Sequence, residues 1–178
     1  ARENAAGIDL KSSIRNYKDD RHKPELIVAL MPGFEALVGF RPIEELQEIL
    51  GELSVCEGEL GEYSTEWLAK VASIDQVFTE ILSLGNRARG LVASILAVAA
   101  QGDLTAQALA VAKRVAEHYP GDPGVLVTLF MNHVTLDAGQ AIAVPAGQVH
   151  AYLKGLGVEV MAESDNVLRG GLTKKHID

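Results

Sequence analysis

The chain has 178 residues, of which 48% are hydrophobic, and its formal net charge is −8. This length suits one domain with room for a smaller second one, and the apolar content is sufficient for a buried core. The negative charge argues against a general binder of nucleic acids or anionic membranes, because those surfaces attract basic proteins. The single cysteine excludes an internal disulfide and a zinc site built from several thiolates of one chain.

Short apolar runs near the start of the chain predict strands. Leu26–Leu30 lies between Pro24 and Pro32, and a second run covers Phe34–Phe40. No basic start followed by an apolar run is present, so no secretory leader is expected. The longest apolar stretch, 91–100, has about half the length of a membrane-spanning helix, and we expect a cytoplasmic protein.

Residues 42–119 have the periodicity of helices. Pro42 suits the first turn of a helix, and apolar residues follow it at helical spacing. Ser64 or Thr65 is expected to cap the second helix, whose apolar stripe continues to residue 82. Two further helices are expected, over 87–100 and 105–118.

The period changes again after the turn sequence at 119–124. Val125–Phe130 and Ala141–Val144 are rich in β-forming residues and are followed by further turns. The order is therefore strands, helices, strands. It predicts an α+β fold in which an all-α domain, 42–123, is inserted into an antiparallel β domain formed by 1–41 and 124–178.

The charge follows the same division. Ten acidic residues and one basic residue lie between 42 and 80, whereas the rest of the chain is close to neutral. The acidic run is expected to form a solvated face of the helices. Basic residues near both ends of the chain could recognise an anionic ligand, but ordinary surface lysines and arginines explain them equally well.

A turn-to-strand pattern, Gly-x5-Pro-x-Gly-x2-His, covers residues 139–150. Pro145 and Gly147 are expected to form a tight turn that starts the next strand and directs His150 into a barrel. Cupin barrels present a metal-binding histidine in this way. One histidine makes no metal site, however, and a hydrogen-bonded core histidine fits the pattern equally well.

Two other segments carry polar groups at the ends of apolar runs. In the first, Pro24 separates Lys23 from Glu25, and a carboxylate at a strand start can bind zinc beside imidazoles. In the second, Arg169 precedes two glycines, so little backbone crowding limits its approach to a carboxylate, phosphate or enediolate oxygen. Taken alone, the first segment is better explained as ordinary surface.

Five sequence blocks, in this order, closely resemble type I phosphomannose isomerases, and together they cover nearly the whole chain. They are His-Lys-Pro-Glu at 22–25, Phe-Glu-Ala-Leu at 34–37 with Gly-Phe-Arg-Pro at 39–42, Tyr-Pro-Gly-Asp-Pro-Gly at 119–124, Pro-Ala-Gly-x-x-His-Ala-Tyr-Leu at 145–153, and Ser-Asp-Asn-Val-Leu-Arg-Gly-Gly-Leu-Thr at 164–173. The resemblance implies a partial cupin-type antiparallel β barrel or jelly roll with an inserted all-α domain. It also implies the interconversion of mannose 6-phosphate and fructose 6-phosphate through an enediol.

The resemblance further implies one zinc ion held by Gln, His, Glu and His. Glu25 matches the glutamate and His150 the second histidine, whereas the other two ligands belong to a Gln-x-His segment ahead of Ala1. Arg169 matches the arginine assigned to catalysis. The remaining matches are the candidate catalytic residues Lys23 and Asp165 and the candidate substrate-binding residues Tyr152, Glu159 and Lys175.

Both ends of the sequence are expected to be cuts through a longer, monomeric protein whose partner is a small sugar phosphate. With two of four ligands, the 178 residues alone are expected to bind zinc weakly or not at all and to have little activity. Tight zinc binding would require a further ligand, such as His22 or His176.

Two other classes of function are open from the sequence. A different cupin metalloenzyme would require a His-x-His pair in the β part, which the sequence lacks. A non-enzymatic, cupin-like binding or interaction module could use the acidic helical part.

Overall fold

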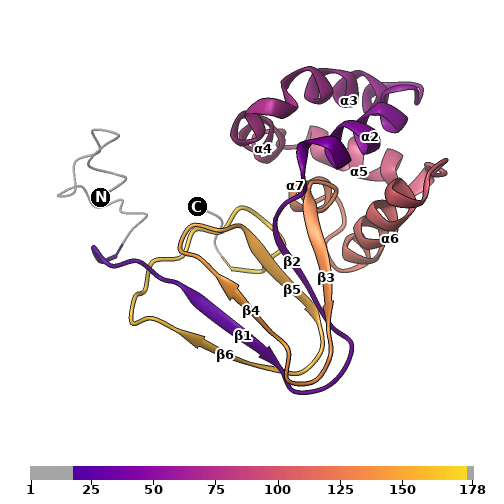
Figure 1. Ribbon diagram of the computed structural model, residues 1–178. Helices are drawn as coiled ribbons and strands as arrows, with labels where there is room; N and C mark the ends of the chain where they lie inside the picture. Colours follow the sequence, from indigo (N-terminus) through magenta and orange to yellow (C-terminus); the bar gives the residue numbers. More distant parts are fainter. Residues whose placement is uncertain (1–17, 176–178) are drawn as a thin grey trace.

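The computed structural model describes residues 18–175. Figure 1 shows two small sheets next to a group of helices. The strands are β1 (Glu25–Ala29), β2 (Phe34–Phe40), β3 (Met131–Leu136), β4 (Ala141–Val144), β5 (His150–Lys154) and β6 (Gly157–Met161). The helices are α2 (Ile43–Ser54), α3 (Glu59–Lys70), α4 (Ile74–Leu82), α5 (Arg87–Ala97), α6 (Asp103–His118) and α7 (Pro123–Thr128), with a short 3-10 helix, η1 (Val71–Ser73).

The strands form two antiparallel sheets, with the orders β4-β1-β6 and β3-β2-β5. All the helices of the described region lie between β2 and β3 in the sequence, so the expected order of strands, helices and strands is found. The first residue of β1, Glu25, pairs with Val144 on one side and Met161 on the other. In the second sheet Val38 pairs with His150, which fixes the start of β5 against the middle of β2.

Strand β2 separates two apolar cores because successive side chains of a strand point to opposite faces. Phe34 and Ala36 pack with Ile27 of β1 in a small core between the sheets. Leu37 belongs instead to the larger core, which lies among the helices and includes Trp67. One face of this sheet therefore meets the other sheet, and its opposite face meets the helices.

The prediction of a strand over Val125–Phe130 is wrong, because most of this range belongs to helix α7. The helix also crosses the predicted domain boundary between 123 and 124. Asp122 caps the helix by accepting a hydrogen bond from Gly124 N at 2.7 Å, and Pro123 occupies the first turn. The β-branched residues misled the prediction because this short helix is buried on all sides, so its sequence shows no amphipathic period.

The cap expected at Ser64 or Thr65 is also wrong, since both residues lie inside α3, which begins at Glu59 after Gly58. Gly58 has a φ of 78°, a conformation that glycine adopts without the cost that a Cβ brings. The expected continuous stripe to residue 82 is divided into two helices by η1.

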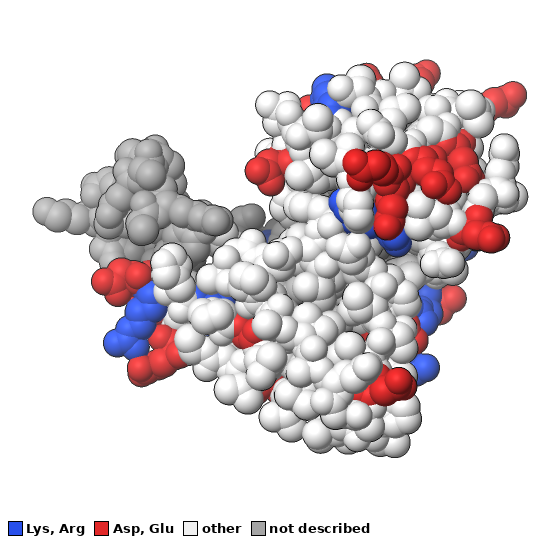
Figure 2. All heavy atoms as spheres, in the orientation of Figure 1, with Lys and Arg blue, Asp and Glu red and all other residues white. Residues whose placement is uncertain are grey.

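The acidic residues of 42–80 are exposed or half-buried, as expected for a solvated face. Figure 2 shows carboxylates gathered over the helical part of the molecule. In residues 18–175 no helix combines the length and the apolar character needed to cross a membrane.

A polar contact ties the helices to the second sheet. Glu35 of β2 accepts a hydrogen bond from Arg114 of α6 and lies 3.1 Å from His133 Nε2 of β3. Only 13% of the Glu35 side chain is exposed, so its charge depends on these partners. Arg114, with His133 adding to it, lowers the pKa of Glu35 below its ordinary value of 4.5.

We predict that Glu35→Gln destabilises the chain at pH 7 by roughly 1–3 kcal/mol, because Arg114 loses its charged partner. A carboxylate with a lowered pKa stabilises the fold above its unfolded pKa, and this contribution disappears as the pH falls through the folded pKa. The difference between wild type and variant should therefore shrink below about pH 4. Urea unfolding at pH 7 and pH 3.5 measures it.

Glu80→Gln is the matched control, because it breaks the Lys70–Glu80 ion pair, whose two side chains are 40% and 42% exposed. Such surface pairs contribute only about 0–1 kcal/mol. Equal effects of the two substitutions, or an effect of Glu35→Gln that does not change with pH, would contradict the role of Glu35.

Candidate metal centre

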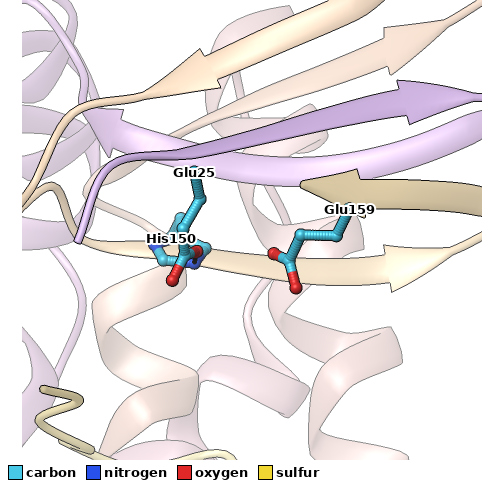
Figure 3. A group of neighbouring side chains, drawn as sticks. All are labelled: Glu25, His150 and Glu159. Atoms are coloured by element: carbon cyan, nitrogen blue, oxygen red, sulfur yellow. Dashed lines mark ion pairs between the residues drawn. The ribbon is translucent and has the colours of Figure 1, made fainter. Parts of the chain in front are cut away.

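Three side chains from both sheets converge at one point, as Figure 3 shows: Glu25, His150 and Glu159. Each offers one ligand atom, and these atoms all lie within 4.8 Å of one another. Glu25 Oε2 and His150 Nε2 are 2.9 Å apart. The carboxylate after the proline and the histidine after the turn thus meet between the sheets, although the helices separate them in sequence.

Strand register explains why the two glutamates share a face. Glu159 pairs with Ile27, and directly opposed residues of neighbouring strands point to the same side. Glu25 lies two residues before Ile27, so it also points to this side. Ile27 is buried in the core between the sheets, which places both carboxylates at the edge of that core.

The turn before β5 positions His150. Gln148 N donates to Pro145 O at 3.0 Å, and Gly147 adopts a φ of 83°. Gly39 of β2, with a φ of 65°, permits the close approach of this segment, because a Cβ at this position would lie 2.3 Å from Nε2 of Gln148. The β-turn and an irregularity of β2, whose register against β3 shifts between Leu37 and Phe40, together fix where the histidine enters the sheet.

A backbone contact orients the imidazole ring. Nδ1 of His150 lies 2.9 Å from Gln148 O, a distance at which a protonated Nδ1 donates to the carbonyl. In that tautomer Nε2 has a free lone pair and faces the carboxylate of Glu25, the arrangement that metal-binding histidines use. An imidazole nitrogen with two carboxylate oxygens is a donor set that suits zinc.

Lys23 and Tyr152 each contact one of the two glutamates. Nζ of Lys23 lies 3.2 Å from Glu25 Oε1, and only 15% of its side chain is exposed. The hydroxyl of Tyr152 donates to Glu159 Oε1 at 2.7 Å. Burial, with the Glu159 carboxylate adding to it, raises the pKa of Tyr152 well above 10.0, so the hydroxyl keeps its proton at neutral pH.

The other residues named from the sequence lie in the segment after β6. Asp165 and Lys175 are exposed there and Arg169 is half-buried. His22 is exposed, and His176 lies outside the described residues. The family resemblance implies that Glu159 binds substrate, whereas the geometry also makes it a potential metal ligand. No spacing signal could have revealed this, because Glu159 meets His150 across two different sheets.

No protein-family model matches the chain. Its two antiparallel sheets with inserted helices are, however, similar to part of solved phosphomannose isomerases. A variant of the enzyme from Salmonella typhimurium superimposes with a TM-score of 0.74 at 36% identity, over 99% of this chain and 44% of that one. A structure described as mannose 6-phosphate isomerase with zinc bound gives a TM-score of 0.72 at 36% identity and covers the same shares.

In sequence, too, the chain is similar to proteins of this name. The chain is 36% identical to mannose-6-phosphate isomerase of Salmonella typhimurium over all of its 178 residues, which are 44% of that protein. It is 35% identical to the Homo sapiens enzyme, over 92% of this chain and 42% of that one. These findings confirm the resemblance and the α+β fold expected from the sequence, and the chain spans less than half the length of these relatives.

We predict that any Zn²⁺ binding by this chain depends on all three convergent residues. His150→Ala and Glu25→Gln should abolish binding, and Glu159→Gln should weaken it by about tenfold or more, since three protein ligands are the usual minimum for zinc. Competition with a chromophoric chelator measures the affinity. Glu163→Gln is the control, because this neighbouring glutamate is 93% exposed. Retained affinity in His150→Ala would contradict this site.

We also predict that Tyr152 limits stability at alkaline pH. A group whose pKa is raised by folding stabilises the fold fully below its unfolded pKa and loses this contribution as the pH rises. Wild type should therefore lose more stability than Tyr152→Phe between pH 8 and about pH 11. Urea unfolding at both pH values tests this, with Tyr63→Phe as the control that leaves Tyr152 intact. Parallel losses in wild type and Tyr152→Phe would contradict it.

Proposed function

We propose that this chain forms part of the catalytic unit of a zinc-dependent mannose-6-phosphate isomerase, which interconverts mannose 6-phosphate and fructose 6-phosphate. The observation that carries the proposal is the meeting of Glu25 and His150 between the sheets at 2.9 Å, in a chain similar along its whole length to enzymes of that name. The residues present fit a zinc ion, which solved relatives contain.

Each residue of the candidate metal centre would have its own role. Glu25 and His150 would hold the metal, with Glu159 close enough to join them. When bound, zinc supplies Lewis-acid polarisation of substrate oxygens. Lys23 places a positive charge beside Glu25, where it can face an anionic substrate. Tyr152 holds the carboxylate of Glu159 in one orientation.

The reaction itself moves a proton between C1 and C2 of the sugar through a cis-enediol. Arg169 would stabilise the negative charge that develops on the enediolate oxygens, as preorganised donors do at such sites. Lys23 and Asp165 complete the proposed catalytic residues, and Lys175 joins Tyr152 and Glu159 in substrate binding. The proton-transferring group must lie within hydrogen-bond reach of C1 and C2.

The same proposal includes the domain division, the partner, the oligomeric state and the location of the protein. The proposed division is a β part, 1–41 and 124–178, and a helical insertion, 42–123, with α7 extending from the insertion across the second boundary. The protein's partner would be a small sugar phosphate, with no role for nucleic acid or membranes, and the whole protein would act as a monomer. The single cysteine and the acidic composition agree with a cytoplasmic location.

A coupled assay of the whole protein with mannose 6-phosphate tests the function. We predict that Arg169→Ala lowers kcat by about 100- to 1000-fold, the usual cost of removing one donor to a developing oxyanion, and leaves zinc content unchanged. Arg169→Lys should recover only part of the loss, because lysine keeps the charge but not the planar fork. Arg87→Ala, on a helix, is the matched control.

Two results would count against this proposal. Wild-type protein without mannose 6-phosphate turnover would favour the non-enzymatic binding module instead. Loss of zinc from Arg169→Ala, or unchanged turnover, would refute the role given to this arginine.

A further inference from the structure

The segment after β6 has no regular secondary structure up to residue 175, yet it carries Asp165 and Arg169. It starts beside the candidate metal centre, because Met161 pairs with Glu25 and Ala162 N donates to Pro24 O at 3.1 Å. Beyond this point no strand ladder holds it. Its position must therefore be fixed by side chains.

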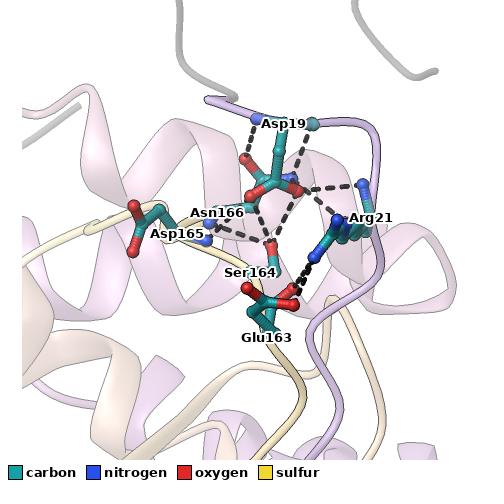
Figure 4. Close-up of polar contacts among 6 residues, drawn as sticks. All are labelled: Asp19, Arg21, Glu163, Ser164, Asp165 and Asn166. Atoms are coloured by element: carbon teal, nitrogen blue, oxygen red, sulfur yellow. Dashed lines mark hydrogen bonds and ion pairs between the residues drawn. The ribbon is translucent and has the colours of Figure 1, made fainter.

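Asp19 holds the first part of this segment, as Figure 4 shows. Its carboxylate accepts hydrogen bonds from Asp165 N at 2.8 Å, Ser164 Oγ at 2.9 Å and Asn166 Nδ2 at 2.9 Å. It also accepts one from Arg21 N at 2.9 Å. The bond from Asp165 N, ahead of the others, lowers the pKa of Asp19, so these bonds are made to a charged acceptor at neutral pH.

Asn166 completes the contact from the other side. Its side-chain oxygen accepts from Lys18 N at 2.7 Å and Asp19 N at 3.1 Å. Its amide group donates to Asp19 O at 2.9 Å and to Arg21 O at 3.0 Å. A side chain of each segment thus hydrogen-bonds to the backbone of the other segment. These bonds together fix the position of the two segments relative to each other.

Asp122 holds the other end of the segment. Its Oδ2 accepts from Leu172 N at 3.2 Å, while its Oδ1 caps α7. Leu172 has a φ of 52°, a left-handed conformation that costs energy for a leucine and persists only where neighbours hold it. A Cβ on Gly171 would lie 2.6 Å from Oδ1 of Asp122, so the close approach requires glycine.

We propose that Asp19 and Asp122 are positioning residues that hold the two ends of the segment 164–172 and thereby set the place of Arg169 between them. This inference rests on the proposed function, since it concerns the arginine of that site. Both carboxylates belong to segments far from 164–172 in the sequence, and they bond to its backbone. The sheets pair independently of them, so their loss should displace the segment while the fold remains.

Hydrogen exchange and kinetics of the same variants test the proposal. Asp19→Ala should speed exchange of the Asp165 and Asn166 amides at least tenfold, and Asp19→Asn, which keeps one acceptor oxygen, should give an intermediate rate. In the whole protein Asp19→Ala should lower kcat/KM for mannose 6-phosphate by about 10- to 100-fold, as a displacement on the order of 1 Å does. Zinc content and the folded fraction at the assay temperature should stay at wild-type values.

The second anchor has its own variant. Asp122→Ser keeps a side-chain oxygen that can cap α7, but it lacks a second oxygen for Leu172 N. Exchange at Leu172 should accelerate while α7 keeps its protection. Glu163→Gln is the control for both anchors, because this glutamate lies on the same segment, is 93% exposed and only pairs with Arg21.

The outcomes separate this inference from the proposed function. Exchange and kcat/KM of Asp19→Ala equal to those of Glu163→Gln would overturn the anchoring role. A fall in kcat/KM matched by equal falls in zinc content and folded fraction would show a purely structural role and also overturn it. If wild type has no isomerase activity, the proposed function fails, and the exchange rates still decide whether the carboxylates hold the segment.

Discussion

The contact between Glu25 and His150 joins the two sheets where β1 and β5 begin, and the rest of the site depends on it. Two polar groups that face each other at the edge of an apolar core cost free energy unless they bond to each other or to a ligand. One oxygen of the carboxylate lies beside His150 Nε2 and the other beside Lys23 Nζ. These neighbours limit the movement of the Glu25 side chain, and a metal or a sugar phosphate requires binding groups that are held in place.

The helices hold the second sheet, and with it His150, in position opposite Glu25. Leu37 of β2 packs into the helical core, and Glu35 on the same face bonds to Arg114 of α6. The opposite face of β2 carries Ala36, which pairs with Tyr152 beside the candidate site. One strand therefore connects the helical core to the site, and a change in helix packing would reach Tyr152 through β2.

The sequence predicted β1, β2, β4, the start of β5 and the helical insertion, because turns and periodicity are local signals, and the resemblance to a family predicted the pair Glu25 and His150. It failed at α7, where burial on all sides removes the helical period and leaves a strand-like composition. It also could not reveal that Glu159 lies within reach of His150. The distance depends on the register of β6 against β1 and on how the two sheets face each other. Neither property can be read from the spacing of residues in the sequence.

Asp122 shows why such non-local contacts matter for the site. One oxygen of its carboxylate caps α7, and the other holds Leu172 at the end of the segment that carries Arg169. Both bonds are made to one planar carboxylate, so the cap of α7 and the end of the segment share one side chain. The first turn of α7 thus helps to hold the segment 164–172, whereas the sheets hold Glu25 and His150. Arg169 and the candidate metal ligands are positioned by different parts of the fold, and their relative geometry depends on the packing of the helices against β2.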